Sequence, residues 1–514
     1  MSVRIAGDDD ITVVTENTPL VRGPETVEAP ESPTAAWKPG HSRSPTLASV
    51  SNASISISTT TKPGTIVCLF FLITFAVSAA DAFKQIPMTR IFEDILCHEY
   101  YGKAPGSDDP IDEELCKVDA VQSSLAYLFA VLESLNAGLS CLVALLWGVV
   151  ADRIGRKPVY AASSVGMVLS LLFTMVVGWF SDTLPPRLIW VSSLAHLCGG
   201  SPVINACIYS ILSDVVPDSN RSITFMRIHV TSLVGNLISP ALASAMMSLT
   251  GPWPVMLLTF ILWTIGVALV ALIPETFHRP ISSDDAESQS ATFKTRALQG
   301  LSQLKDSLVV VRTRSVALIF CICVLSYPVI MCTLQFMVQF TSKRYHIPLA
   351  ETGYIQSIYG IAHIAVVLLI VPSISSLVVH PSTPRWLRIS DEEKSDLVLV
   401  RWSYAAYMVG SFVLGISASL SVFVGGLIIM SLGSGASSFI KSIAASHVDA
   451  EHRSRLFTVM ALLEVGSNIW TTPALAGLFT LGMKLGGDWI GLPYIGVSLT
   501  CLAMLVLSLF VSAK

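Results

Sequence analysis

Long apolar stretches recur along the chain and are separated by short polar segments. A helix needs about 20 mostly apolar residues to cross a bilayer, and twelve stretches after residue 62 come near that length. They cover residues 64–84, 123–149, 158–180, 187–212, 224–250, 253–273, 314–340, 351–379, 403–420, 421–445, 456–481 and 491–511. The pattern therefore predicts an all-α membrane protein with twelve transmembrane helices.

Two polar segments divide this pattern. Residues 1–62 are rich in Ser, Thr and Pro and lack the basic-then-apolar order of a signal peptide, so we expect a disordered tail. Residues 275–313 form a polar loop at the centre of the chain. The expected organisation is thus a tail, a six-helix half over 63–274, the central loop, and a second six-helix half over 314–511.

An internal repeat supports two related halves. The segment SILSDVVPDSNRSITF (210–225) aligns with SIAASHVDAEHRSRLF (442–457) at an offset of 232 residues, and Asn236 then falls on Asn468. Both segments join the fourth and fifth predicted helices of their half. Repeated halves are how many secondary transporters build a central site at the bilayer midplane.

Basic residues predict the orientation in the membrane. Of the 32 Lys and Arg residues, 24 lie in the tail, the loops or helix ends of one face, and 8 lie on the other. Cytoplasmic loops carry the excess of Lys and Arg. We therefore expect both termini in the cytoplasm.

Composition narrows the class of protein. Hydrophobic residues make up 52% of the chain and charged residues 13%, whereas a soluble domain carries about a quarter charged residues. A net charge of −4 gives no reason to expect nucleic acid as a partner. The cysteines lack metal-site spacing, and no phosphate-binding G-x-x-x-x-G-K-[ST] loop occurs. We expect no metal, no cofactor, no ATP-driven pumping and no enzyme.

The sequence GVVADRIGRK (148–157) lies in the turn between the second and third predicted helices. Its pattern resembles the signature that the major facilitator superfamily carries at this place, and the resemblance extends over about residues 64–511. It implies the major facilitator fold, with two pseudo-symmetric halves. The residues that match the signature are Gly148, Asp152, Arg153, Gly155, Arg156 and Lys157.

The resemblance also implies a gating role for this motif. Asp152 would meet the positive N-terminal end of the eleventh helix, near Arg455–Phe457. Arg153 or Arg156 would reach an acid at the end of the fourth helix, for which Asp214 is the candidate. Gly148 and Gly155 would permit close approach. The alternative is that these charges only set the topology.

Three features depart from the family pattern. His196 stands where the family's fourth helix has an Arg, the antiporter motif of the fifth helix is absent from LVGNLISPALAS, and VVHPSTPRW replaces a second copy of the signature. The long first outer loop and IPMTRIFEDILCHEYY resemble fungal-type drug and metabolite transporters, which look related to the proton-coupled folate transporter group.

Ionisable residues inside membrane spans are costly and mark functional sites. Glu133 is the first candidate for a coupling proton site, the alternative being a structural hydrogen bond. His196 and His363 serve either in proton handling or substrate contact, or are satisfied interior histidines. Glu464 joins the gating region or lines the cavity. Further candidates for the cavity are the polar residues Gln335, Gln339 and Asn136.

Two local pairs are also expected near the outer face. Asp81 and Lys84, at the outer end of the first span, have the i,i+3 spacing of an ion pair. The acidic outer loop 85–122 contains Cys97 and Cys116, which form either a disulfide or two free thiols.

The expected function is secondary transport, and the preferred form is proton-coupled export of a small drug-like or secondary-metabolite molecule. Proton-coupled uptake of an organic nutrient or anion is the alternative, and a non-transporting sensor is a third reading. The expected partners are the organic substrate, protons and the lipid bilayer, with the protein a monomer. The plasma membrane is the preferred location, and an acidic dileucine-type sequence at Glu16 leaves a vacuolar or endosomal membrane open.

Overall fold

The computed structural model describes residues 63–102, 111–216, 218–273, 314–371, 373, 392–448 and 453–512. These residues belong to the unit formed by residues 59–514. Their regular structure is helical, with no strand among them. The predicted tail, 1–62, and the predicted central loop, 275–313, lie outside the described residues.

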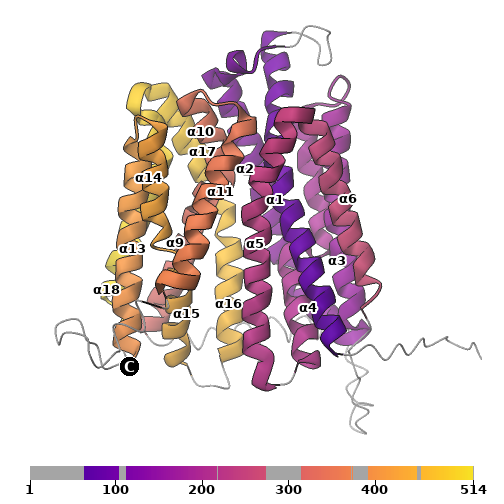
Figure 1. Ribbon diagram of the computed structural model, residues 1–514, viewed down its shortest axis with the longest axis vertical. Coiled ribbons are helices and arrows are strands. Elements are labelled where there is room, and N and C mark those ends of the chain that lie inside the picture. Colours follow the sequence, from indigo (N-terminus) through magenta and orange to yellow (C-terminus); the bar gives the residue numbers. More distant parts are fainter. Residues whose placement is uncertain are drawn as a thin grey trace, which may run out of the picture. The chain divides into compact units, whose positions relative to one another are not determined.

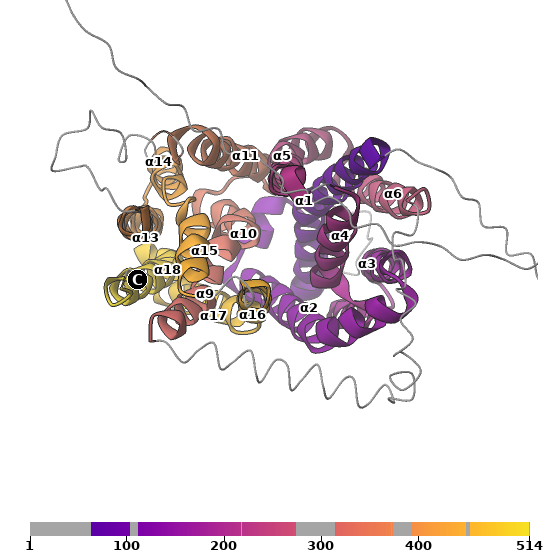
Figure 2. The same ribbon diagram turned by 90° about the horizontal axis from the view of Figure 1, so that it is seen from below.

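The helices form two groups, which we call the first and the second half. The first half contains α1 (Pro63–Tyr101), η1 (Glu113–Lys117), α2 (Asp119–Ile154), α3 (Arg156–Trp179), η2 (Pro186–Cys198), α4 (Gly200–Val215), α5 (Asp218–Thr250) and α6 (Pro252–Val270). The second half contains α9 (Arg314–Thr333), α10 (Gln335–Tyr345), α11 (Leu349–Ala365), η4 (Val366–Ile370), α13 (Glu392–Ile416), α14 (Leu420–Ser431), α15 (Ala436–Ser446), α16 (Arg453–Gly466), α17 (Asn468–Leu485), η6 (Gly487–Gly491) and α18 (Leu492–Leu509). Viewed along the helices, the two halves stand side by side (Figure 2).

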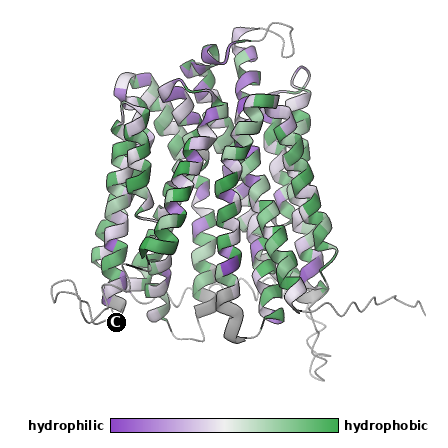
Figure 3. Ribbon diagram, in the orientation of Figure 1, coloured by the Kyte–Doolittle hydropathy of each residue, from purple (hydrophilic) through white to green (hydrophobic). Residues whose placement is uncertain are grey.

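The helices run between two ends of the bundle (Figure 1). We call the end at which α2 passes into α3, near Gly155, the motif end. The opposite end, at which α1 leads through η1 into α2, is the disulfide end. Apolar residues cover most of the length between them (Figure 3).

Eleven stretches of the described residues are long and apolar enough to cross a bilayer. They match eleven of the twelve predicted spans. The remaining predicted span, 456–481, is made of two consecutive helices, α16 and α17, which are separated at Ser467. The Ser467 hydroxyl donates a 2.7 Å hydrogen bond back to the carbonyl oxygen of Glu464, a bond that competes with regular helix geometry.

The first helix is much longer than the predicted span 64–84. Residues 85–101, which we expected in an outer loop, continue α1 to Tyr101. Ile91, Phe92 and Ile95 are buried at helical spacing, so an apolar face persists beyond the continuous apolar run. This correction places Asp81 and Lys84 near the middle of a 39-residue helix rather than at its end.

Helix interruptions recur at matching positions of the two halves. In the first half, η2 ends before Gly199 and α4 follows. In the second half, α14 ends at Ser431, which is 232 residues further on, and α15 begins after a turn. Gly199 has φ +128°, and a Cβ there would lie 2.4 Å from the Oγ atom of Ser163, so this break requires glycine.

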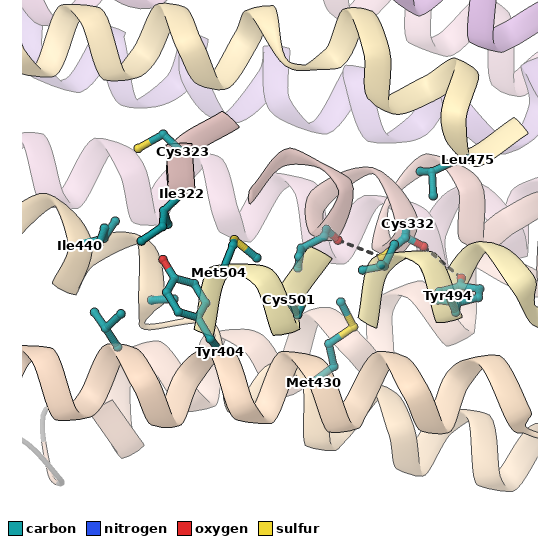
Figure 4. Packing of buried hydrophobic residues seen from close by; sticks show 14 of the residues in the cluster. Ile322, Cys323, Cys332, Tyr404, Met430, Ile440, Leu475, Tyr494, Cys501 and Met504 are labelled. Carbon is teal, nitrogen blue, oxygen red and sulfur yellow. Dashed lines mark hydrogen bonds between the residues drawn. The ribbon is translucent and has the colours of Figure 1, made fainter. Parts of the chain in front are cut away.

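Each half has its own hydrophobic core. The core of the first half includes Phe70 and Tyr160. The core of the second half includes a cluster of aromatic rings, in which the Phe340 and Tyr494 centroids are 4.7 Å apart. The Tyr494 hydroxyl donates to the carbonyl oxygen of Cys332 at 3.0 Å (Figure 4). Buried Tyr hydroxyls need such a partner, so the ring packs without leaving an unpaired polar group.

The two halves meet along α5 with α11 and along α2 with α17. A Cβ at Gly353 of α11 would lie 2.3 Å from the carbonyl oxygen of Pro240 in α5. The Gly353 N–H instead donates to Ser244 Oγ at 3.1 Å. Glycine therefore allows the halves to approach closely on the side of the bundle nearer the disulfide end.

Candidate functional site

A pair of opposite charges lies near the middle of α1. The Nζ atom of Lys84 is 2.8 Å from Oδ1 of Asp81, so the predicted i,i+3 ion pair is present. The side chains keep 33% and 36% of their surface accessible. The further charges that act on Lys84 and Asp81 belong to α2 and η2 of the same half. The pair therefore faces a space among the helices.

Glu133 of α2 is the further acid whose charge interacts with this pair. It senses the charges of Lys84 and Asp81, and the Asn136 side chain donates a hydrogen bond to it. The Oδ1 atom of Asn136 is buried without a partner among the described atoms. Tyr327 of α9, in the second half, also senses the charge of Glu133. The site thus draws groups from both halves.

This group of residues, which we call the central cluster, has a charge balance that one proton can change. With Glu133 ionised, the carboxylates of Asp81 and Glu133 outnumber the Lys84 ammonium by one charge. A proton on Glu133 makes the three residues neutral together. An uncompensated charge in a low-dielectric site is unfavourable, which makes Glu133 a candidate for exchanging a proton.

His196 lies beside the central cluster, at the end of η2 that precedes the break at Gly199. The side chain is buried, and its Nδ1 atom has no hydrogen-bond partner among the described atoms. The charges of Lys84 and Asp81 act on the ring. A backbone hydrogen bond with Ser193 also acts on the ring, so both roles expected for His196 stay predictions.

A pocket extends from the central cluster toward the disulfide end. The space open to the centre of a water molecule is about 40 Å³, and the whole space including the open mouth is about 460 Å³. Phe129 and Ala130 line it one helical turn from Glu133 on α2, and Met331 lines it one turn from Tyr327 on α9. The remaining lining residues are Thr89, Ala126, Phe336, Gln339, Thr472, Leu475 and Ala476. Apolar walls with a few polar groups are typical of sites for organic ligands.

A second set of titratable groups lies nearer the motif end. Lys441 of α15 pairs with Glu464 of α16 at 3.2 Å, so Glu464 is not an isolated acid. His363 packs its ring 5.8 Å from that of Tyr359 and senses His229 of α5. His229 in turn senses Lys441. In this set, His229 belongs to the first half, and His363, Lys441 and Glu464 belong to the second.

At the motif end, the signature turn braces helices of the first half. Gly155 has φ +103°, a conformation that favours glycine, between α2 and α3. Arg156 forms an ion pair with Asp214 and donates to the Ser210 carbonyl oxygen at 2.8 Å. Lys157 donates to the carbonyl oxygen of Ala271 at 2.9 Å. These contacts hold α3 against α4 and the end of α6.

Other predicted motif residues are placed differently or not described. Among the described residues, no atom lies within 4 Å of a Cβ built on Gly148, and the close approach expected there stays a prediction. The side chains of Asp152, Arg153 and Gln335 lie outside the part of the structure that is described. The Arg156–Asp214 pair lies within one half and does not itself join the two halves.

At the disulfide end, Cys97 of α1 and Cys116 of η1 are joined by a disulfide. Beside it, Lys117 and Glu93 form an ion pair at 2.8 Å, with only 3% and 1% of their side chains exposed. Gln122 donates to Glu93 at 2.6 Å. Gln339 does not stand in the central cluster, since its Nε2 atom donates to the Gln122 carbonyl oxygen at 2.7 Å.

The comparison with known families decides the identity of the fold. A sequence model of the Major Facilitator Superfamily matches residues 66–470. The chain belongs to this superfamily. The signature turn at 148–157 and the two helical halves are the features of this member that agree with it.

Curated relatives of this superfamily member include fungal transporters. The chain is 27% identical over 430 residues to "MFS efflux pump atnC" of Emericella nidulans, covering 81% of this chain and 82% of the relative. It is 26% identical over 455 residues to the MFS-type transporter aprT of Aspergillus flavus, covering 85% and 87%. The crystal structure of the human organic anion transporter MFSD10 matches with a TM-score of 0.53 at 15% identity, covering 87% of this chain and 99% of that one. That structure supports the fold alone.

The sequence reasoning missed several residues of the site. From the sequence we expect Lys84 at a helix end. We expect Glu93, Lys117 and Gln122 in an outer loop. The helical spacing of Ile91 and Ile95 is the signal that predicts the extension of α1. No local signal indicated that Gln122 would meet Gln339, which is 217 residues away.

Proposed function

We propose that this protein is a secondary transporter that exports a small organic molecule in exchange for protons. The central cluster carries the proposal. It places Asp81, Lys84 and Glu133 near the middle of the bundle with part of their surface accessible, and intramembrane ionisable groups are characteristic of proton relays. The efflux-pump relative supports export.

In this mechanism, Glu133 exchanges the proton. When Glu133 is protonated, the central cluster is neutral and its attraction for a cationic or hydrogen-bonding substrate group is weaker. When Glu133 loses the proton, the excess negative charge returns. Proton and substrate then compete for one site, which couples their movement in opposite directions. His196 and Tyr327 are the further groups positioned to contact the polar part of the substrate.

The apolar pocket would hold the body of the substrate. Phe129, Met331 and Phe336 line it, and it adjoins the polar groups of the central cluster. A bulky organic molecule with few polar groups fits such a site better than a sugar, which requires many hydrogen bonds.

The signature turn would support gating at the motif end. The described bonds of Arg156 and Lys157 make α3, α4 and α6 a rigid unit, against which Asp152 would engage the start of α16. With the motif end in the cytoplasm, as the Lys and Arg distribution predicts, this gate closes the inner side. We propose that the protein acts as a monomer in the plasma membrane.

Transport in sealed vesicles of known orientation tests this function. A panel of organic compounds is offered under a pH gradient that can be reversed. Movement of a compound against the direction of the proton gradient supports export by antiport. Movement with the protons supports the uptake alternative, which the altered fifth-helix motif favours. No flux of any compound under either gradient would favour the sensor reading.

A further inference from the structure

The disulfide end is closed by polar contacts between the two halves, and several come from one short segment of the first half, Ile111–Gln122. The contacts are Glu113 Oε1 with the Leu349 N–H at 2.8 Å, Asp119 Oδ1 with Lys343 Nζ at 2.7 Å, the Gln122 carbonyl oxygen with Gln339 Nε2 at 2.7 Å, the Lys117 carbonyl oxygen with Lys343 Nζ, and Glu114 with His346.

The same segment is attached to α1 by different means. The Cys97–Cys116 bond joins η1 to α1 covalently. Ile111 and Val121 pack around this disulfide in a small buried cluster. Lys117 reaches the buried carboxylate of Glu93 on α1. The segment thus has one set of contacts inward to its own half and another across to the second half.

These two sets differ in exposure to water. Across the halves, the side chains of Asp119, Glu114 and His346 are 60%, 53% and 64% exposed, whereas the Gln122–Gln339 hydrogen bond is buried. Toward α1, Lys117 and Glu93 are almost completely buried. Exposed ion pairs contribute little because water replaces them readily, whereas separating a buried pair leaves a charge without compensation. Separation should therefore occur between the segment and the second half.

We propose that Ile111–Gln122 is the first half's part of an outer gate, and that the Cys97–Cys116 bond makes the segment move with α1. Lys343 and Gln339 of α10 are its main partners in the second half. The inference rests on the proposed transport function, because a carrier must open each side in turn.

The pocket behind this gate supplies a reporter position. Ala126 is buried, lines the pocket, and lies one helical turn inward from Gln122 on α2. An Ala126→Cys variant is treated from the disulfide side with a membrane-impermeant maleimide, and the labelling rate at position 126 is measured by peptide mass mapping. A closed gate slows this labelling.

Lys343 and Arg344 provide a matched comparison on one helix. Lys343 contacts the first half, whereas Arg344 donates to the Gly487 carbonyl oxygen and pairs with Asp488, both in its own half. In the reporter background, Lys343→Ala should raise the labelling rate several-fold, and Arg344→Ala should leave it near the native rate. Equal rates for the two variants would overturn the gate.

The disulfide is tested in the same background with Cys97→Ser and Cys116→Ser together. Without this bond, Lys343 holds the segment on the second half when α1 moves away, so the serine variant should label more slowly than the native protein. Adding Lys343→Ala releases the segment from the second half and should restore fast labelling. A native labelling rate in the serine variant would refute the role of the disulfide. If that variant does not fold, reduction of the Cys97–Cys116 bond in the folded protein replaces it, with the same expected slowing and the same contradiction.

The labelling assay needs no substrate, so the two proposals can fail separately. Fast labelling of Lys343→Ala in a protein that moves no compound would retain the gate and reject the transport proposal. Measured flux together with unchanged labelling would retain transport and reject this gate.

Discussion

The Nζ atom of Lys84 lies 2.8 Å from Oδ1 of Asp81 near the middle of α1, and Glu133 of α2 is the further acid that acts on this ammonium group. Lys84 is therefore paired directly with Asp81, and its charge also acts on Glu133. This relationship makes Lys84 the residue on which the charge balance of the central cluster depends.

Replacing Lys84 tests that dependence. Lys84→Met should abolish most transport and lower the stability of the detergent-solubilised protein by about 1–2 kcal/mol, since two carboxylates lose their counter-charge. Adding Asp81→Asn should recover part of the stability, because one of the two unpaired carboxylates is gone. Thermal unfolding and vesicle flux measure the two effects. A single variant as stable as the native protein would contradict this dependence.

Glu133→Gln removes the group proposed to exchange the proton. The amide keeps the size and the hydrogen bond to Asn136 but cannot ionise, so transport driven by a pH gradient should lose its pH dependence. Glu133→Asp, which keeps the carboxyl group, is the control and should retain a pH profile. Flux measured over a range of pH in vesicles decides the point, and an unchanged profile in Glu133→Gln would remove this residue from coupling.

Asp152 and Asp214 should behave differently. Asp152→Asn should impair transport without preventing membrane insertion, since its proposed contact forms in only one state of the cycle. Asp214→Asn breaks the Arg156 pair, whose side chains are 22% and 33% exposed, and should cost about 0.2–1 kcal/mol of stability. Flux, surface expression and thermal unfolding are measured for both. Full activity of Asp152→Asn would argue against its gating role.

The ionisation of Glu113 should make the stability of the disulfide end depend on pH. Burial raises the pKa of its carboxyl group, but the charges of Lys117 and Arg90 and the Leu349 N–H outweigh burial and hold the pKa below the ordinary value of 4.5. The ionised carboxylate therefore stabilises the fold at neutral pH, and this contribution is lost as pH falls below 4.5. Glu113→Gln should be less stable than the native protein at neutral pH. The difference in melting temperature should shrink in acid, and a constant difference would show that ionisation is irrelevant.

Gly353→Ala should hinder closure at the disulfide end. The added Cβ would lie 2.3 Å from the Pro240 carbonyl oxygen, and overpacking of this kind costs about 1–3 kcal/mol. Faster maleimide labelling at Ala126→Cys is the expected result. Gly425→Ala is the control, because its Cβ would meet nothing within 4 Å. Similar labelling in both variants would mean that α5 and α11 need no close approach.

The membrane fold could be predicted from the sequence because spans and loops differ in local composition. For this reason, the presence of the membrane spans could be predicted. The repeat of segment 210–225 in segment 442–457 predicted two related halves. The ends and interruptions of the helices were harder to predict from the sequence. Continuous apolarity predicted an end at residue 84, whereas a one-sided apolar face carried α1 to Tyr101.

The candidate site was predictable only where contacts are local. The Asp81–Lys84 pair follows from helix periodicity, and the turn at Gly155 follows from the conformational freedom of glycine. Only the tertiary structure decided that Gln339 meets Gln122, that Lys117 finds Glu93, and that Gly353 lets α11 reach α5. Local spacing determines which side chains share a helix face, but contacts between distant segments depend on how whole helices pack. The sequence alone therefore indicated the family and pointed to Glu133 as the candidate acid inside the membrane. The packing of the helices decided which residues close the disulfide end.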